Sequence, residues 1–229
     1  MSEKSRQGRT QHADNRVAVI ATDGFEEAEL TEPVKALRDA GLFVDIIAPH
    51  DGEIQGFRHH DKSITVPVDR TLDQADPEDY IAVVLPGGAL NADAMRMNTE
   101  AQDFLRAMDD IHKPMAVICH APWELVSAGL ARGRTMTSWP TLQDDIRNAG
   151  GQWVDREVVV DDNLITSRKP DDLPAFNREL LQRVSHQHAS AAAGDWPAGD
   201  AAGGRAAASD RPQNRRREGA GKQKASTAQ

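Results

Sequence analysis

Short apolar runs alternate with amphipathic segments through the middle of this 229-residue chain. The runs are continuous stretches rich in Val, Ile, Leu and Ala, as in strands buried on both faces of a sheet; they lie at 16–22, 42–49, 80–88 and 114–119. The segments with apolar residues at helical spacing lie at 25–41, 99–112 and 122–133. Strands that alternate with helices pair in parallel and are covered on both faces. The sequence therefore predicts an α/β fold, a three-layer sandwich around a mostly parallel sheet.

Further segments add to this core. Residues 52–72 contain turn glycines and short alternating runs, which predict a hairpin, and residues 157–168 predict a second one. Pro33 lies inside the first helical segment, so we expect that helix to kink or restart there. A short strand and two more helices are expected at 135–138, 141–151 and 171–184.

The two ends of the chain lack this pattern. Residues 1–15 have no apolar side chain larger than alanine after Met1, and they lack the apolar centre of a signal peptide. Residues 185–229 are rich in Ala, Gly, Arg and Ser and offer no periodic apolar face. Neither end buries enough apolar surface to offset its loss of conformational entropy. We therefore expect a disordered arm at 1–15, one domain at 16–184 and a disordered tail at 185–229.

Charge and composition argue against several classes of protein. The net charge is −9, and because the tail is basic the rest is more acidic still, which argues against a specific nucleic-acid partner. No run approaches the ~18 apolar residues that span a membrane. The single cysteine cannot form an internal disulfide, which fits a reducing cytoplasm. His59 and His60 lack partners at zinc-ligand spacing and are interpreted as an exposed loop, so neither a metal nor a nucleotide cofactor is expected.

The only cysteine, Cys119, ends a strand and is followed by a helix that Pro122 opens. A strand, a nucleophile and a helix in this order form a nucleophile elbow at the carboxyl edge of the sheet, where ligands bind. The N-terminus of the helix favours the thiolate over the thiol. A lone cysteine is also often a small buried hydrophobe, but the elbow position and the adjacent His120 favour a catalytic role.

Backbone donors are expected around this cysteine. The N–H groups of His120 and Ala121 lie at the start of the helix, where they can stabilise an oxyanion. The Gly87-Gly88 turn follows the neighbouring strand and can bring in another N–H group. These residues define the expected oxyanion and substrate pocket.

Acidic residues follow the first strand at the same edge of the sheet. Glu26 and Glu29 are three residues apart, so they share one face of a helix. A carboxyl beside a thiolate is driven to keep its proton and donates it to the sulfur in a hydrogen bond. We assign this role to Glu26, at the turn itself, and interpret Glu27 as a charge that complements the helix N-terminus.

Several motifs together resemble the PfpI family, whose members are cysteine-peptidase-like proteins of the class I glutamine amidotransferase-like superfamily. The motifs are "GFEEAEL", "VVLPGG", "AVICHAPWELVSAG", "MTSWP" and "SRKPDDLPAFN", and the likeness covers about residues 16–184. The resemblance implies a flavodoxin-like sandwich with Cys119 as nucleophile, His120 beside it and Glu26 hydrogen-bonded to the cysteine. It also implies that Asp93, in a loop, orients His120 of a neighbouring subunit in a homo-oligomer between a dimer and a hexamer.

Three functions are compatible with this resemblance. The first is a stress-protective enzyme that acts on small carbonyl compounds or glycated adducts, like a glyoxalase or a deglycase. The second is an intracellular cysteine peptidase that acts on unfolded protein, and the third is a non-catalytic redox-sensing stress protein. Glutamine amidotransfer is disfavoured because the only later histidines, His186 and His188, lack the Glu of a His-x-Glu pair. We expect the first function.

Overall fold

The computed structural model describes residues 15–193, with side chains through Ser185. Seven strands form the central sheet in the order β11-β12-β8-β7-β1-β3-β6, and every neighbouring pair is parallel except β11 and β12. The strands are β1 (Arg16–Ile20), β3 (Phe43–Ala48), β6 (Arg70–Thr71), β7 (Ala82–Leu85), β8 (Met115–Ile118), β11 (Val158–Asp161) and β12 (Leu164–Ser167). The central strands are fully buried because both faces are covered, as their continuous apolar runs predict.

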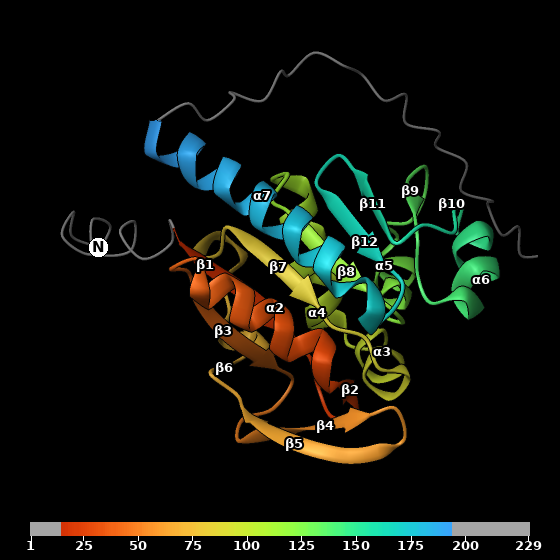
Figure 1. Ribbon diagram of the computed structural model, residues 1–229, viewed down its shortest axis with the longest axis horizontal. Coiled ribbons are helices and arrows are strands. Elements are labelled where there is room, and N and C mark those ends of the chain that lie inside the picture. Colours follow the sequence, from red (N-terminus) through yellow and green to blue (C-terminus); the bar gives the residue numbers. More distant parts are fainter. Residues whose placement is uncertain (1–14, 194–229) are drawn as a thin grey trace, which may run out of the picture. The chain divides into compact units, whose positions relative to one another are not determined.

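Helices cover the two faces of this sheet and bury two separate apolar cores. Helices α2 and α7 pack side by side on one face (Figure 1), and α3 to α6 contribute to the core on the other. The helices are α2 (Glu27–Asp39), α3 (Ala89–Met95), α4 (Thr99–Asp110), α5 (Pro122–Ala128), α6 (Gln143–Asn148) and α7 (Leu173–Ala193). Single turns of 3-10 helix lie at Leu72–Gln74, Pro77–Asp79, Pro140–Leu142 and Pro170–Asp172. The predicted three-layer α/β sandwich is thus confirmed.

A hairpin projects beyond the sheet at one end of the molecule (Figure 1). Its strands β4 (Glu53–Arg58) and β5 (Asp61–Pro67) are antiparallel, and β2 (Phe25–Glu26) pairs in parallel with β4. The hairpin expected within residues 52–72 is therefore present. Its pairing with β2 brings its tip close to the residues that follow β1, which matters for the site.

Some expected elements differ in detail. Helix α2 is continuous through Pro33, because Pro33 is buried with Leu30 and Leu37 and this packing outweighs the lost hydrogen bond. The strand near residues 135–138 is β9 (Thr135–Met136), which pairs with β10 (Gln152–Trp153) in a separate two-stranded sheet. Residues 89–95, which we expected to be a loop, form α3.

The last helix is longer than the sequence pattern indicates. Helix α7 continues to Ala193, beyond the expected domain end at residue 184. The segment after Val184 is rich in alanine, which has the highest helix propensity, so a helix can extend there without an apolar face. The rest of the expected tail and nearly all of the expected arm lie outside the described residues.

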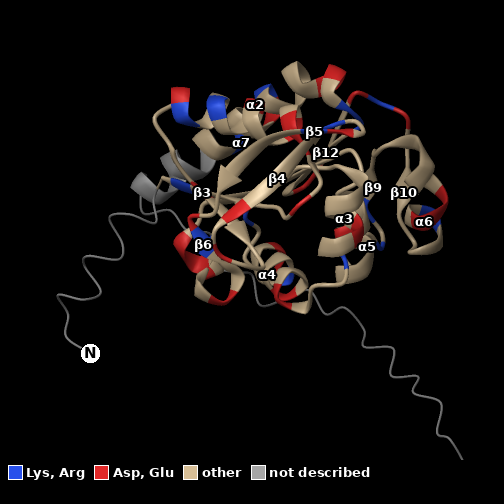
Figure 2. Cartoon of the chain, turned by 90° about the horizontal axis from the view of Figure 1, so that it is seen from below, with Lys and Arg blue, Asp and Glu red and all other residues tan. Residues whose placement is uncertain are grey.

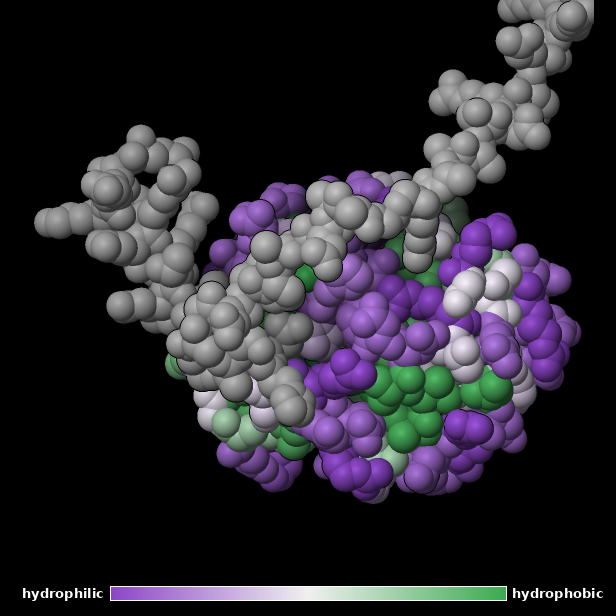
Figure 3. Space-filling model, turned by 90° about the horizontal axis from the view of Figure 1, so that it is seen from above, coloured by the Kyte–Doolittle hydropathy of each residue, from purple (hydrophilic) through white to green (hydrophobic). Residues whose placement is uncertain are grey.

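Charged residues of both signs lie on the helices and loops of the described chain (Figure 2). Figure 3 shows one larger apolar area bordered by hydrophilic residues, and smaller apolar spots elsewhere on the face seen there. The large apolar side chains exposed among the described residues are Phe43, Leu90, Met97 and Trp139. Within residues 15–193, no helix is both long enough and apolar enough to cross a membrane.

Candidate active site

Cys119 occupies a strained turn between β8 and α5. Its φ angle is 63°, in the left-handed region that residues other than glycine seldom adopt. Its N–H donates to the carbonyl of Ser167 (3.0 Å), and its own carbonyl accepts from the N–H of Trp139 (2.8 Å). These bonds fix the turn at the carboxyl edge of the sheet, where the cysteine lines a pocket although only 6% of it is exposed. The geometry is that of a nucleophile elbow.

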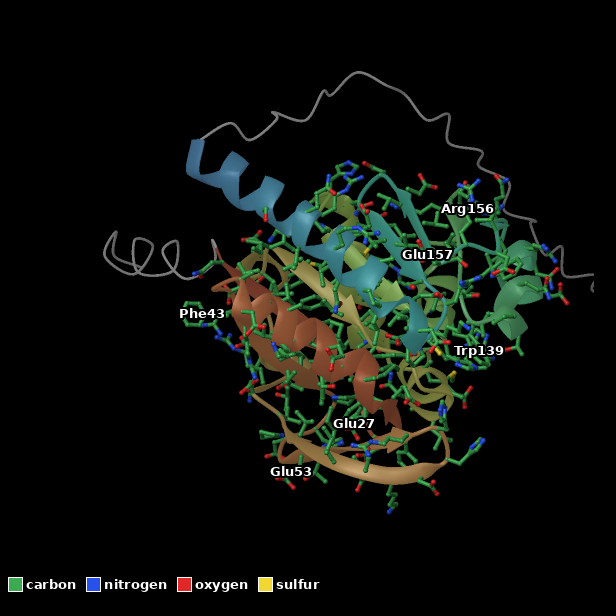
Figure 4. The ribbon with its side chains drawn as sticks, in the orientation of Figure 1. Glu27, Phe43, Glu53, Trp139, Arg156 and Glu157 are labelled. Atoms are coloured by element: carbon green, nitrogen blue, oxygen red, sulfur yellow. The ribbon has the colours of Figure 1, made fainter. Side chains whose placement is uncertain are left out.

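His120 lies beside the thiol and is held between two indole rings. Its Nδ1 is 3.2 Å from Cys119 Sγ. The imidazole stacks on Trp139 (centroids 5.7 Å apart, planes at 24°) and meets Trp123 at a tilt (5.5 Å, 58°). Figure 4 shows Trp139 at this edge of the molecule. Burial lowers the pKa of His120, so the ring is neutral at neutral pH and can accept a proton.

Glu29, rather than Glu26, is the acidic residue against the cysteine. Glu29 is fully buried, its Oε2 accepts from the N–H of Gly87 at 2.9 Å, and Glu29 and Cys119 shift each other's pKa. Glu26 is only half-buried, and its Oε2 accepts from the backbone N–H of His59 at 3.0 Å. Our assignment of the thiol contact to Glu26 is therefore corrected. Glu26 ends β2 at the pocket wall, whereas Glu29 lies in the first turn of α2 on the face that packs inward.

The backbone donors also differ from expectation. The backbone N–H groups that lower the pKa of the Cys119 thiol are those of Gly88 and His120. The N–H of Ala121 instead donates to the carbonyl of Ile118 (3.1 Å), and that of Gly87 donates to Glu29. Ala121 and Gly87 are thus occupied within the fold, and the N–H groups that remain for an oxyanion are those of Gly88 and His120.

Both glycines of the turn after β7 are required by close packing. A Cβ atom on Gly87 would lie 2.6 Å from the Cβ of Cys119 and 2.5 Å from Glu29 Oε2. Gly88 has a φ of +91°, and a Cβ there would lie 2.2 Å from the carbonyl oxygen of Gly24. Glycine at these positions lets the backbone approach the thiol.

Burial sets the protonation of the pair formed by Cys119 and Glu29. It raises the pKa of Glu29 to about 8, so the acid is neutral at neutral pH. Burial, followed by the charge of ionised Glu29, also raises the pKa of the Cys119 thiol, which the N–H groups of Gly88 and His120 lower only in part. This direction is opposite to the thiolate that we expected from the helix N-terminus. Desolvation dominates here because so little of the cysteine reaches solvent.

A single pocket of about 510 Å³ contains Cys119, Glu29 and His120. Its other walls include residues from the β4–β5 hairpin, from the start of α3 and from the loop before α7. They are Gly24, Glu26, Phe57, His59, His60, Gly88, Ala89, Leu90, Trp139 and Pro170. His59 and His60, which the sequence indicated as part of an exposed loop, are exposed but also line this pocket. No group of three or more metal-ligating side chains lies together among the described residues.

Asp93 lies exposed on α3 and does not line the pocket of its own chain. Leu90, one turn earlier on α3, does line the pocket. The orienting role expected for Asp93 requires a second subunit and stays a prediction.

A cysteine at the elbow of a flavodoxin-like α/β sandwich, with a buried acid and a histidine beside it, defines a class of cysteine-centred proteins. The family model for the DJ-1/PfpI family matches residues 15–183. The chain belongs to this family, which confirms the resemblance inferred from its motifs.

Two related sequences and one solved structure each match most of the chain. The Escherichia coli protein named "Protein/nucleic acid deglycase 2" is 40% identical over 73% of this chain and 96% of its own length. The Bacillus subtilis protein named "Putative cysteine protease YraA" is 39% identical over 72% of this chain and 96% of its own. The crystal structure of Drosophila melanogaster DJ-1beta has a TM-score of 0.69 at 29% identity, and covers 79% of this chain and 96% of that chain.

Proposed function

We propose that this protein is a cysteine-dependent enzyme that acts on small carbonyl compounds and on their adducts with protein side chains. The observation that carries this proposal is the cluster of the Cys119 thiol, a neutral imidazole 3.2 Å away and a buried neutral carboxyl at one pocket. The name of the Escherichia coli relative gives the same reaction class.

The first step is addition of the sulfur to an aldehyde. The thiol proton passes to Nδ1 of His120 as the sulfur bonds to the aldehyde carbon, and the carbonyl π electrons move to the oxygen. The N–H groups of Gly88 and His120 favour negative charge at the sulfur, since they lower the pKa of the thiol, and we assign to them the stabilisation of the developing oxyanion. Local proton transfer compensates for the raised pKa of the thiol, because no free thiolate has to persist in the buried site.

For methylglyoxal, the product is lactate. A base removes the proton from the former aldehyde carbon, and a proton returns to the ketone carbon, which leaves a lactate thioester on Cys119. Water cleaves this thioester and restores the thiol. One carbon is oxidised and the other is reduced within the same molecule, so no external oxidant or reductant is needed. We assign these proton transfers to Glu29 and His120, which is supported by the 3.2 Å between His120 Nδ1 and the sulfur and by the raised pKa of Glu29.

An adduct of the aldehyde with an amine follows the same course once the sulfur has replaced the amine nitrogen. The sulfur replaces the nitrogen on the former aldehyde carbon, the C–N bond breaks, and the nitrogen leaves with the proton that His120 took from the thiol. The side chain of the target protein is thereby restored.

The proposal is tested by following methylglyoxal loss and lactate formation with purified protein. The wild type should form lactate, and Cys119→Ala should form it only at the rate of buffer alone. Because Cys119→Ser keeps the size of the side chain, it separates loss of the thiol from a packing defect. Full lactate formation by Cys119→Ala would contradict the proposal.

Peptide hydrolysis is a second candidate, which the name of the Bacillus subtilis relative favours. The same thiol would attack a peptide carbonyl. This candidate requires cleavage of an unfolded protein such as casein by the wild type and not by Cys119→Ala. Reversible oxidation of Cys119 without turnover of either substrate would instead support the redox-sensing alternative.

A further inference from the structure

Two indole rings contact His120, and only one of them lines the pocket. Trp139, which stacks on the imidazole, is a pocket residue, whereas Trp123, which meets it at a tilt, is not. Trp123 follows Pro122 in the first turn of α5, and its backbone N–H donates to the carbonyl of His120 at 3.1 Å. Trp123 therefore contacts the histidine without being a wall of the substrate pocket.

The indole of Trp123 is held by two charged side chains from other elements. Its Nε1–H donates to Oδ2 of Asp145 at 2.7 Å, and Asp145 belongs to α6, which packs against α5 (Figure 1). The guanidinium of Arg96, at the end of α3, lies 5.2 Å from the centroid of the ring, and its Nε donates to Ser127 Oγ at 3.2 Å. A hydrogen bond to a carboxylate and a cation–π contact both have a preferred direction. The plane of this indole is thus defined by polar contacts as well as by packing.

The orientation of the His120 ring decides whether it can take the proton of the thiol. Its Nδ1 lies 3.2 Å from Cys119 Sγ. Proton transfer needs the nitrogen at this place, and rotation of the ring about its Cβ–Cγ bond would move the nitrogen away. The two indoles restrict that rotation because they contact the imidazole. A ring that was free to turn would spend part of its time with a carbon atom towards the sulfur.

We propose that Asp145 is a positioning residue of the reaction: its bond to Trp123 fixes the indole, and the indole in turn fixes the ring of His120. Nδ1 is thereby kept towards the thiol. The inference deepens the proposed function, on which it rests for the proton transfer. Asp145 does not line the pocket, so it acts through Trp123 and not on the substrate.

The test measures how readily the thiol gives up its proton, by the rate at which iodoacetamide alkylates Cys119 at neutral pH. Cys119 is the only cysteine, and the sulfur reacts as the thiolate, so an aligned base beside it speeds alkylation. We expect Asp145→Ala to lower this rate about tenfold, which is part of what an aligned base contributes. Asp145→Asn keeps an oxygen that accepts from Nε1 of Trp123, and its rate should stay within about twofold of the wild type.

Asp144→Ala is the matched control, because Asp144 is the preceding residue and also lies in the first turn of α6. Its carboxylate pairs with Arg147 at 3.4 Å. Both alanine variants remove one negative charge from the same helix N-terminus, so a change in helix stability would affect them alike. Asp144→Ala should keep the wild-type rate of alkylation.

A second comparison separates the orientation of the base from access to the thiol. In a His120→Ala background there is no imidazole to orient, so adding Asp145→Ala should change the rate by less than about twofold. Trp123→Phe keeps a ring but has no N–H group to donate. It should lower the rate as Asp145→Ala does, and the two substitutions together should lower it no further.

Three results would overturn the inference. They are an unchanged or faster rate in Asp145→Ala, an equal fall in Asp144→Ala, and a fall that persists in the His120→Ala background. Circular dichroism checks the fold of each variant, and Trp123→Phe carries the same test if Asp145→Ala does not fold. Failure of the proposed function is seen separately, because absence of lactate formation from methylglyoxal does not alter an alkylation rate.

Discussion

Two glutamates lie fully inside the fold, and burial keeps both of them neutral. Glu29 shares a pKa coupling with the cysteine, and one of its oxygens accepts from a backbone N–H group. Glu124, in the first turn of α5, has no hydrogen-bond partner for either oxygen, and burial raises its pKa well above the usual range. A buried polar group without a partner reduces stability by about 1–3 kcal/mol. Glu124 is therefore a position where the sequence is not optimised for stability.

Replacing Glu124 by a residue of similar length without charge should stabilise the fold. We expect Glu124→Met to raise the free energy of unfolding by about 1–3 kcal/mol at neutral pH, because the desolvated carboxyl is removed. Urea unfolding measures this change, and Glu53→Met, at an exposed site, should alter the free energy by less than about 0.5 kcal/mol. A loss of stability in Glu124→Met would show that the carboxyl has a partner.

The raised pKa of Glu29 predicts how stability depends on pH. Between pH 4.5 and about 8 the folded state keeps a proton that the unfolded state has released, so the free energy of unfolding falls as pH rises. The contribution is fully present below 4.5 and is lost above 8. The side chain in Glu29→Gln cannot ionise, so the free energy of unfolding of this variant should fall less steeply with pH in this range. The two slopes should differ by up to about 1.4 kcal/mol per pH unit. Parallel pH profiles for wild type and variant would contradict the assignment.

Glu29 should also contribute to catalysis. We expect Glu29→Gln to lower kcat for methylglyoxal by roughly 100-fold, because it removes a proton donor beside the sulfur. The stopped assay for lactate measures this change, and circular dichroism checks the fold. An unchanged kcat in Glu29→Gln would remove Glu29 from the proposed mechanism.

The choice between these two acids shows how far residue-level sequence reasoning reaches. The pattern placed both acids at the correct edge of the sheet, but the turn position alone favoured Glu26. Glu29 lies directly beside Leu30 and four residues before Pro33, both of which are buried. Glu29 is an acidic residue among the buried positions of α2, and this pattern could have identified it as the acid near the thiol.

At the level of elements, the turn after β7 positions the backbone donor for the sulfur. In Gly88→Ala, the left-handed φ and the 2.2 Å approach to Gly24 would displace the turn. We expect kcat to fall by about 100-fold or more, because the N–H of residue 88 would move away from the sulfur. Steady-state kinetics with methylglyoxal provides the measurement.

Gly129, which ends α5, offers a matched control for this change. Its φ is also positive (+79°), but a Cβ there would meet nothing within 4 Å. Gly129→Ala should therefore lower stability by only about 1–2 kcal/mol and leave kcat unchanged. Equal kinetic effects of the two substitutions would mean that strain, and not placement of the donor, explains the loss.

The sequence was informative about elements with strong periodicity and less so about contacts between them. The buried runs predicted the parallel sheet and the elbow because a continuous apolar run is a local pattern, which can be recognised without knowing which strands pair. The position of the hairpin tip against the site depends on the pairing of β2 with β4, which joins residues far apart in sequence. No local pattern carries that information, so His59 and His60 appeared to belong to an isolated loop.

At the scale of the whole molecule, the role expected for Asp93 requires an active unit of more than one chain. Asp93 is exposed on α3 and is absent from the pocket of its own chain. If it orients His120 of a neighbour, Asp93→Asn should lower kcat while light scattering still gives at least twice the mass of one chain. A fully active Asp93→Asn oligomer, or a fully active monomer, would refute this role.

The central claim is that all turnover passes through Cys119, and a titration of this residue tests it most directly. Because Cys119 is the only cysteine, mass spectrometry of the intact chain gives the fraction that iodoacetamide has modified. The same samples are assayed for lactate formation from methylglyoxal. The account predicts that activity falls in direct proportion to the modified fraction and reaches zero at one modification per chain. Substantial activity in fully modified protein would contradict it.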